Sequence, residues 1–282
     1  MTDIAIITES ASNLPQELIE QYPIHVLPIW LTWAGEALRD GIDITAEEVY
    51  NRIETGDIIP TTSTFNASEL VAILENLPPE TEAAIAILLS GELSMSVNVA
   101  SLVAQMPPPV PLHVIDSRTA TMAQGFIVLE TARAAAAGAT VEQALAVARD
   151  MVDRVNFMCV LETFKYLHRG GRVGIAPYYL GETLQIKPII ALQPGIGEVK
   201  PVARPRTWHK AVDQMLEMIE EIVGQQPLHA AVSHGNRQAE AERVAEILRQ
   251  RFDVRELFIN HLTPEMGAHA GPLVGVAFFT GE

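Results

Sequence analysis

Residues 83–105 of the chain read AAIAILLSGELSMSVNVASLVAQ, and this stretch decides the class of fold. Residues 83–89 are an unbroken apolar run, which is typical of a buried strand. A polar turn follows at residues 90–94, and residues 97–105 have the pattern of a helix. A strand, a turn and a helix in this order form the repeating unit of a parallel sheet covered by helices.

The same order occurs at two other places in the first half. Residues 4–7 are a short β-branched run followed by a polar loop, and Pro15 then opens a helix for which Asn13 is the expected cap. The third unit begins with the strand-like segment 112–116 and continues into a helix that ends near Gly138. We therefore expect a Rossmann-like α/β domain with a parallel sheet.

The loops of such a domain are candidate binding segments. In a parallel α/β sheet the loops after the strands meet at one edge, where binding residues gather. Here these loops are the polar turns at residues 8–13, 90–94 and 116–121.

The pattern changes near residue 156. Short strand-like runs then follow one another closely, at residues 157–161, 189–192, 199–203, 230–233, 256–259 and 274–279. Two long helices, predicted at residues 208–223 and 237–252, separate some of them. This spacing indicates a mixed sheet. A length of 282 residues, at about 150 residues per domain, then predicts two α/β domains, residues 1–155 with a parallel sheet and residues 156–282 with a mixed sheet.

The net charge excludes some classes of partner. The chain carries 35 acidic and 19 basic residues, a formal charge of -16, which repels nucleic-acid phosphates and anionic lipid head groups. We therefore expect no nucleic-acid partner. Between residues 165 and 210, however, eight basic residues accompany two acidic ones, so this stretch carries +6. It favours a bound anion or an anionic partner, or it consists of solvated side chains and pairs with acids elsewhere in the fold.

Cysteine content and hydropathy predict the compartment. Cys159 is the single cysteine, so an intramolecular disulfide and any multi-cysteine metal site are excluded, and a reducing setting fits best. Residues 1–8 lack the basic and apolar regions of a secretion signal, and no run of 18 apolar residues occurs. We expect a cytoplasmic protein without membrane insertion.

Two clusters of hydroxyl residues are candidates for holding an anion. Residues 60–64 read PTTST and include Thr61, Thr62 and Ser63. Residues 90–96 read SGELSMS, with Ser94 between a strand and a helix. Hydroxyls and the free N–H groups at a helix start can hold an anion without a formal positive charge. The alternative for both clusters is capping of a turn or helix.

Two glycine-containing motifs could also contact a ligand. In Arg169-Gly-Gly-Arg172 the glycines permit close approach, and arginine binds oxyanions through two parallel hydrogen bonds, although the motif is also typical of a helix end. In Gly267-Ala-His269-Ala-Gly271 one histidine lies among small residues that leave room for a ligand. A structural role for His269 is the alternative.

The usual signatures of several enzyme classes are missing from the sequence. The chain has no Gly-x-Ser-x-Gly, no Gly-x4-Gly-Lys-Ser/Thr, no His-Glu-x-x-His and no Gly-x-Gly-x-x-Gly after a strand. Hydrolase, nucleotide-kinase, zinc-protease and dinucleotide-binding hypotheses therefore lose their usual support. We expect no metal ion, no cofactor and no catalytic residue.

The order of the short motifs resembles the DegV family over essentially the whole chain. The motifs are Thr8-Glu-Ser10 with Asn13-Leu14, Arg39-Asp-Gly41, Pro60-Thr-Thr-Ser63, Leu93-Ser94, Val114-Ile-Asp-Ser117, Arg169-Gly-Gly-Arg172, Ile186-Lys-Pro188, His234-Gly235 and Gly267-x-His269-x-Gly-Pro272. The resemblance implies a bacterial fatty-acid-binding protein of two α/β domains. It implies that an acyl chain such as that of palmitate lies in a buried apolar tunnel, with its carboxylate at the domain interface.

Residue by residue, the resemblance implies a head-group site. It places hydroxyls that bind the carboxylate at Thr62, or its neighbours Thr61 and Ser63, and at Ser94, with His269 and Arg172 nearby. The chain departs from the family where members usually read Leu-Ser-Gly-Thr and Thr-His-Thr-Gly-Pro-Gly: it has Leu93-Ser-Met-Ser96 and Ala268-His-Ala-Gly-Pro-Leu273. Met95 is therefore expected to crowd its loop, and Ala268 and Ala270 remove hydroxyls beside the histidine.

The resemblance also implies a role in lipid transport or fatty acid metabolism. In some members the bound acid is presented to a separate fatty acid kinase, and the binder has no nucleotide site of its own. The alternative is an acyl hydrolase or transferase that uses Ser94 and His269. A third hypothesis makes the chain a docking subunit whose cationic stretch, including Arg204 and Arg206, meets an acidic kinase.

Overall fold

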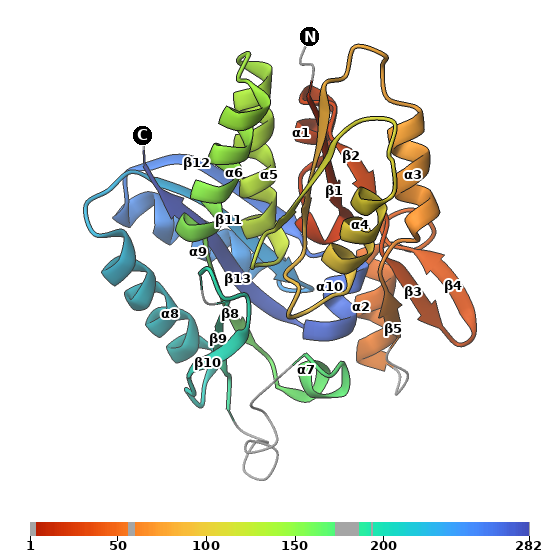
Figure 1. Cartoon of the computed structure of the whole chain (residues 1–282). Coiled ribbons are helices and arrows are strands. Elements are labelled where there is room, and N and C mark those ends of the chain that lie inside the picture. Colours follow the sequence, from red (N-terminus) through yellow and green to blue (C-terminus); the bar gives the residue numbers. More distant parts are fainter. Residues whose placement is uncertain (1–3, 56–59, 173–185, 193, 282) are drawn as a thin grey trace.

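The computed structural model describes residues 4–55, 60–172, 186–192 and 194–281 (Figure 1). The strands of the first half are β1 Ile4–Glu9, β2 His25–Leu27, β3 Trp30–Trp33, β4 Glu36–Arg39, β5 Thr61–Ser63, β6 Ala83–Leu88 and β7 Leu112–Asp116. Its helices are the 3-10 turn η1 Ser10–Ser12, α1 Gln16–Gln21, α2 Ala46–Thr55, α3 Ala67–Glu75, α4 Ser96–Gln105, α5 Thr121–Ala136 and α6 Val141–Arg154. The strands of the second half are β8 Asn156–Leu161, β9 Ile189–Leu192, β10 Val199–Ala203, β11 Leu228–Gly235, β12 Val254–His261 and β13 Leu273–Thr280. Its helices are α7 Lys165–Arg169, α8 Trp208–Val223, α9 Gln238–Arg251 and α10 Pro264–Ala270.

The N-terminal sheet has the strand order β2-β1-β6-β7, and each neighbouring pair is parallel. On β6, Ile85 and Ile87 belong to the apolar cluster that contains α5 and α6, whereas Ala84 and Ala86 belong to the cluster with α3 and α4. Helices therefore cover both faces of β6, which explains why its sequence is apolar at every position. The predicted parallel-sheet α/β fold of the first half is confirmed.

The C-terminal sheet has the order β10-β9-β8-β13-β11-β12. Strands β11 and β12 are parallel, and the other neighbouring pairs are antiparallel, so the predicted mixed sheet is also confirmed. Helices α8 and α9 pack on one face of this sheet. Alternate residues of β8, among them Phe157 and Cys159, face the opposite cluster, which contains α5.

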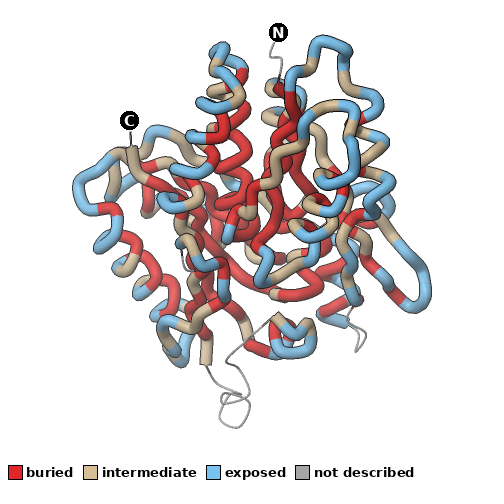
Figure 2. The backbone as a smooth tube through the Cα atoms, in the orientation of Figure 1, coloured by how far each residue is buried: buried red, intermediate tan, exposed pale blue. Residues whose placement is uncertain are grey.

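Helix α5 lies between the two sheets. It contacts β1 and β6 on one side and β11 and β13 on the other, and residues 121–129 are all buried. The ring of Phe126 meets the ring of Phe279 edge-on, with centroids 5.1 Å apart. The buried core consequently continues through both halves of the chain (Figure 2). Strand β8 begins at Asn156, and the division into domains 1–155 and 156–282 remains a proposal.

Two elements near the candidate site have no counterpart in the sequence predictions. One is a small antiparallel sheet of order β4-β3-β5, and the other is helix α10. Strand β5 consists of three hydroxyl residues without apolar alternation, and it is held by pairing with β3, where Thr62 lies opposite Leu31. Helix α10 is seven residues long and rich in small side chains, too short for a helical apolar period to be visible.

The sequence pattern predicted the range of helix α8 correctly but the capping residue of α1 incorrectly. Helix α8 covers the predicted residues 208–223. Asn13, however, does not cap α1, which begins after Pro15. Asn13 instead ends the turn η1 in a left-handed conformation, and its side chain donates to the carbonyl of His261, so the prediction for this residue is wrong. Within the described ranges, no helix is long and apolar enough to cross a membrane.

Candidate functional site

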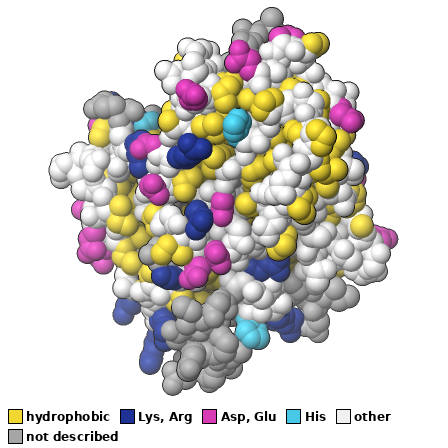
Figure 3. All heavy atoms as spheres, in the orientation of Figure 1, with side chains coloured by type: hydrophobic (Ala, Val, Ile, Leu, Met, Phe, Trp, Pro, Cys, Tyr) yellow, Lys and Arg dark blue, Asp and Glu magenta, His cyan; other side chains and the backbone are white. Residues whose placement is uncertain are grey.

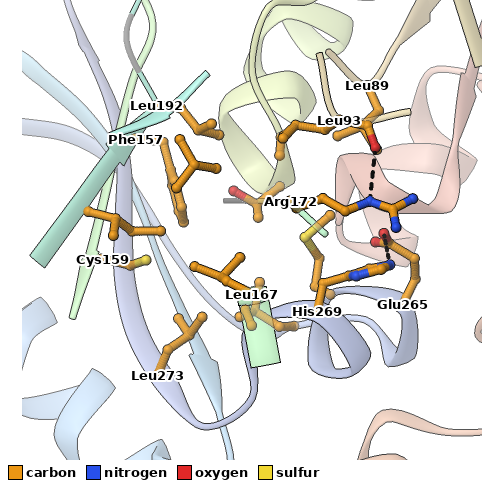
Figure 4. Close-up of a pocket in the computed structure, with 17 residues that line it drawn as sticks. Leu89, Leu93, Phe157, Cys159, Leu167, Arg172, Leu192, Glu265, His269 and Leu273 are labelled. Carbon is orange, nitrogen blue, oxygen red and sulfur yellow. Dashed lines mark hydrogen bonds and ion pairs between the residues drawn. The ribbon is translucent and has the colours of Figure 1, made fainter. Parts of the chain in front are cut away.

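A buried cavity lies between α10, α7 and the inner face of the C-terminal sheet (Figure 4). Its wall on β8 and β9 is apolar and includes Phe157, Cys159, Ile190 and Leu192. The cavity volume is about 70 Å³. By the same measure of volume, one water molecule needs about 10–15 Å³. A chain of many methylenes would therefore have to push the lining side chains apart.

Polar groups gather at one end of this cavity. Figure 4 shows Arg172, Glu265 and His269 facing one another, while Leu192 and Phe157 lie at the opposite end. A cavity with an apolar wall and a few polar groups at one end is suited to an amphiphile with a small polar head.

His269 connects this polar end to the hydroxyl cluster of β5. Its Nε2 atom lies 2.6 Å from Thr62 Oγ1, although the two residues are 207 positions apart in the sequence. Burial, and secondarily the charge of Arg172, lower the pKa of His269 to about 4, so the imidazole is neutral at physiological pH. Thr61 and Ser63 are exposed, because successive side chains of a strand point to opposite faces. Of the three candidate hydroxyls of β5, the structure brings Thr62 alone to His269.

Ser94 is one member of a chain of hydroxyls. Its Oγ accepts a hydrogen bond from the backbone N–H of Ser96 and lies 2.9 Å from Ser96 Oγ. Ser96 Oγ donates to Glu9 Oε2 at 2.6 Å and lies 2.7 Å from Thr64 Oγ1. The other oxygen of Glu9 accepts from the N–H of Leu89. Ser94 does not cap α4, whose N-cap is Met95, but its Oγ holds the turn before this helix within a network that fixes the loop after β6.

Glu9 is a buried acid within the Thr8-Glu-Ser10 motif that was not among the predicted site residues. Burial raises its pKa to about 7, while the hydrogen bonds from Ser96 and Leu89 oppose this rise. The position of Glu9 at the carboxyl end of β1 was a usable signal, because loops after parallel strands collect at one edge. Its pairing with Ser96 could not be found from local sequence.

Arg172 follows the end of α7. Its Nε donates to the carbonyl of Leu93 at 3.3 Å and its Nη1 to the carbonyl of Gly170 at 2.6 Å, and the side chain lines the cavity. Gly170 ends α7 and leaves no room for a Cβ, because one would collide with His269 Nδ1. Gly171 has a φ of +69°. The Arg-Gly-Gly-Arg motif thus both ends a helix and lets an arginine and a histidine share the polar end.

Glu265 is the second buried acid that the sequence motifs did not predict as a site residue. Its side chain is 5% exposed and lines the cavity, and Oε1 lies 3.9 Å from His269 Nε2. Its backbone N–H donates to Asp40 Oδ1. Glu265 is the first acid in α10, a position that by itself predicts only a favourable helix-dipole interaction.

The three departures from the family pattern have different surroundings. Met95 is 60% exposed, so it does not crowd the interior of its loop, and that expectation is wrong. Ala270 lines the cavity directly, whereas Ala268 is buried. An alanine at position 270 therefore leaves the cavity wall apolar where a hydroxyl is usual.

The basic stretch is partly paired with acids. Glu162 binds Lys187 and, through its other oxygen, Arg237 at 2.7 Å. Arg204 and Arg206 are exposed, on the segment between β10 and α8. Figure 3 shows basic side chains spread over the left and lower parts of the face it draws, with acidic side chains between them. In the part of the chain that the structure describes, no group of three or more His, Cys, Asp or Glu side chains is placed to hold a metal ion.

Comparison with known proteins shows a relationship over the full length. The family model described as "Uncharacterised protein, DegV family" matches residues 3–281. A DegV domain-containing protein of Streptomyces coelicolor is 31% identical over 277 residues, which cover 97% of each chain.

Two solved structures have the same fold. A DegV family protein from Thermus thermophilus, described as binding fatty acid, has a TM-score of 0.90 and 27% identity, covering 99% of this chain and 100% of that one. DegV from Bacillus subtilis, described as a fatty acid binding protein, has a TM-score of 0.88 and 28% identity, covering 100% of both chains.

Proposed function

Because this chain belongs to the DegV family, we propose that its buried cavity binds a long-chain fatty acid such as palmitate. The observation that carries the proposal is the polarity of the cavity, which is apolar along β8 and β9 and polar at Arg172 and His269. The relatives from Thermus thermophilus and Bacillus subtilis, described as fatty acid binding, support it.

The acyl chain supplies most of the affinity in this proposal. Burying about 14 to 16 methylenes at roughly 0.8 kcal/mol each gives a gross driving force on the order of 10 kcal/mol before ordering costs. The free energy needed to push the lining side chains apart reduces this gain. The polar head then sets the orientation of the ligand more than its affinity.

We propose that Thr62 and Arg172 supply the donors that bind the carboxylate, and that His269 orients the hydroxyl of Thr62. A neutral His269 with its proton on Nε2 donates to Thr62 Oγ1, which leaves the hydroxyl proton of Thr62 free for a ligand oxygen. The guanidinium of Arg172 has five N–H groups, and two of them bind backbone carbonyls. Its remaining donors and its charge are available to an anion. Ser94 is the further hydroxyl proposed for the head-group site, because Arg172 contacts the carbonyl of the adjacent Leu93.

Identification of a copurified ligand tests the proposal. The purified protein is extracted with organic solvent, and the extract is analysed by mass spectrometry. We expect an acyl species of long chain, and binding of added palmitate after its removal. An extract without acyl species, together with failure to take up palmitate, would exclude the proposed function.

The alternative, an acyl hydrolase or transferase, requires a relay from Ser94 to His269 that the geometry does not favour. Ser94 Oγ is bonded to Ser96, and His269 Nε2 is bonded to Thr62. An orienting acid should act on Nδ1, but Glu265 lies on the Nε2 side. Hydrolysis of an acyl ester that is lost in Ser94→Ala would support catalysis over binding.

We further propose a cytoplasmic role in lipid transport or fatty acid metabolism, in which the bound acid is presented to a separate fatty acid kinase. The exposed Arg204 and Arg206 offer positive charge to an acidic partner. In a reconstituted assay with such a kinase, reversing both charges to Glu should abolish phosphorylation and leave palmitate uptake unchanged. The same reversal at Arg249, on the outer helix α9, is the control. Unchanged phosphorylation in the double variant would exclude this surface.

A further inference from the structure

The polar end of the cavity contains an acid that a carboxylate-binding site would not be expected to include. Glu265 lies directly after Pro264 in the first turn of α10. Acids in a first turn usually face solvent, where the helix dipole stabilises their charge. Glu265 is instead buried and faces Arg172 and His269 in the cavity wall (Figure 4). The carboxylate of a fatty acid bound at this end would meet Glu265 directly.

Glu265 has an unused hydrogen-bonding atom. Its Oε2 atom has no hydrogen-bond partner among the described residues, and Oε1 is beyond hydrogen-bond distance from His269 Nε2, at 3.9 Å. A buried carboxylate without donors is strongly disfavoured, whereas a protonated carboxyl is neutral and carries an O–H donor. Burial, with the charges of Asp40 and Glu9, raises the pKa of Glu265 well above its usual value, and Arg172 opposes this rise.

The other described titratable groups around Glu265 include no second carboxyl that lines the cavity. They are Glu9 on β1, Asp40 after β4, Tyr50 on α2, Cys159 on β8, Arg172 after α7 and His269 on α10. His269 is neutral, and burial raises the pKa of Tyr50 and Cys159, so both of these are neutral as well.

Glu9 and Asp40 titrate near neutral pH, because burial raises their pKa values to about 7 and about 6. Both already accept hydrogen bonds, however. Ser96 Oγ and the N–H of Leu89 donate to Glu9, and the N–H of Glu265 donates to Asp40. These two acids therefore hold neighbouring segments in place, whereas the Glu265 carboxyl is directed into the cavity.

We propose that Glu265 is a head-group-binding residue, whose protonated carboxyl donates a hydrogen bond to the carboxylate of the bound fatty acid; this rests on the proposed function. Hydrogen bonds from a hydroxyl donor to a carboxylate are short, about 2.5–2.7 Å, and roughly twice as strong as neutral ones. Two carboxyl groups in contact share one proton, because both cannot ionise side by side. At a pH where Glu265 is ionised in the free protein, binding of the anion therefore takes up one proton from solvent.

Variants at position 265 test the donor. Glu265→Gln keeps a donor of the same shape and does not titrate, whereas Glu265→Leu has no donor. We expect Glu265→Gln to bind palmitate within about threefold of wild type and Glu265→Leu to bind about tenfold more weakly or worse. Glu217→Gln, at an exposed position of α8, is the matched control.

The pH dependence gives an independent readout. Above the pKa of Glu265 in the free protein, the dissociation constant of wild type for palmitate should rise by up to about tenfold per pH unit, because binding must recapture a proton. Calorimetry in buffers of different ionisation enthalpy should give close to one proton taken up per palmitate. In Glu265→Gln this rise and this proton uptake should both disappear, although Glu9 and Asp40 can still titrate in this variant.

The possible outcomes separate the two proposals. Wild-type affinity in Glu265→Leu, or superimposable pH curves of wild type and Glu265→Gln, would overturn the role of Glu265 and leave fatty acid binding intact. If Glu265→Leu does not fold, the comparison of wild type with Glu265→Gln decides. Failure of wild type to bind palmitate at every pH would overturn the proposed function together with this inference.

Discussion

At the scale of single residues, the proposed head-group site depends on which side chain of a short strand faces inward. Thr61, Thr62 and Ser63 are equivalent as hydroxyls, and their order in the chain does not distinguish them. Pairing of β5 with β3 turns Thr62 towards His269 and leaves its two neighbours exposed. The side-chain alternation of a strand therefore decides a question that residue type leaves open.

This distinction predicts a difference between three neighbouring variants. Thr62→Val removes the hydroxyl and leaves His269 Nε2 buried without a partner, which costs about 1–3 kcal/mol. Palmitate binding should weaken by about tenfold or more. Thr61→Val and Ser63→Ala, on the exposed face, should bind as wild type does. Fluorescence titration of ligand-free protein measures all three, and equal losses in the three variants would contradict the assignment of Thr62.

At the scale of elements, the cavity wall is made by the inner face of β8 and β9. Alternate residues of these strands face α5 and the cavity, and the residues between them face α8. The apolar run of β9 is visible in the sequence, but the face that it presents to a ligand depends on its antiparallel pairing with β8, where Cys159 lies opposite Ile190. In the proposed function, this wall sets the length of acyl chain that fits.

Filling the wall should change the preference for chain length. Leu192→Trp places a larger ring at the end of the cavity away from Arg172, so fewer methylenes fit, at about 0.8 kcal/mol for each one lost. Affinity for palmitate should fall relative to decanoate. Leu192→Met keeps the side-chain volume and should leave the ratio of the two affinities unchanged. Competition binding with both acids measures this ratio, and a wild-type ratio in Leu192→Trp would place the acyl tail elsewhere.

At the scale of the whole molecule, the interface between the two halves concentrates buried titratable groups. Glu9 from the first half is coupled electrostatically to Glu265 from the second. The raised pKa values of buried acids mean that the folded state binds their protons more tightly, so this part of the stability is lost as pH rises. Burial lowers the pKa values of His234 and His269 to about 4, and their contribution has the opposite sign, because it is lost as pH falls below their unfolded pKa.

The variant Glu9→Gln separates the contribution of the buried acid from that of the histidines to the pH dependence of stability. Burial raises the pKa of Glu9 from 4.5 to about 7, so its part of the free energy of unfolding decreases by about 3 kcal/mol as pH rises through that window. Glu9→Gln does not titrate. It should therefore destabilise the ligand-free protein more at pH 5 than at pH 8, relative to wild type. Urea unfolding at both values measures the difference, with Glu217→Gln as the control, and an equal effect of Glu9→Gln at both would contradict an ionising buried Glu9.

The sequence by itself determined the class of fold and the positions of most helices and strands. Apolar runs such as residues 83–89 and the helix at residues 208–223 are local patterns, and the physical forces that act on them are local burial and backbone hydrogen bonding. The ordered motifs also identified the family, which the match over residues 3–281 confirms.

Only the tertiary structure decided which residues form the polar end of the cavity and the hydrogen bonds beside it. Thr62 and His269 are 207 positions apart, and Glu9 reaches Ser96 across 87 positions. Glu265 has an ordinary local signal, a first-turn acid after a proline, and becomes a cavity residue because α10 packs against α2 and α7. Side chains meet across such distances through strand pairing and core packing, which depend on all the elements together. Local periodicity therefore predicts the elements, and the site follows from how they pack.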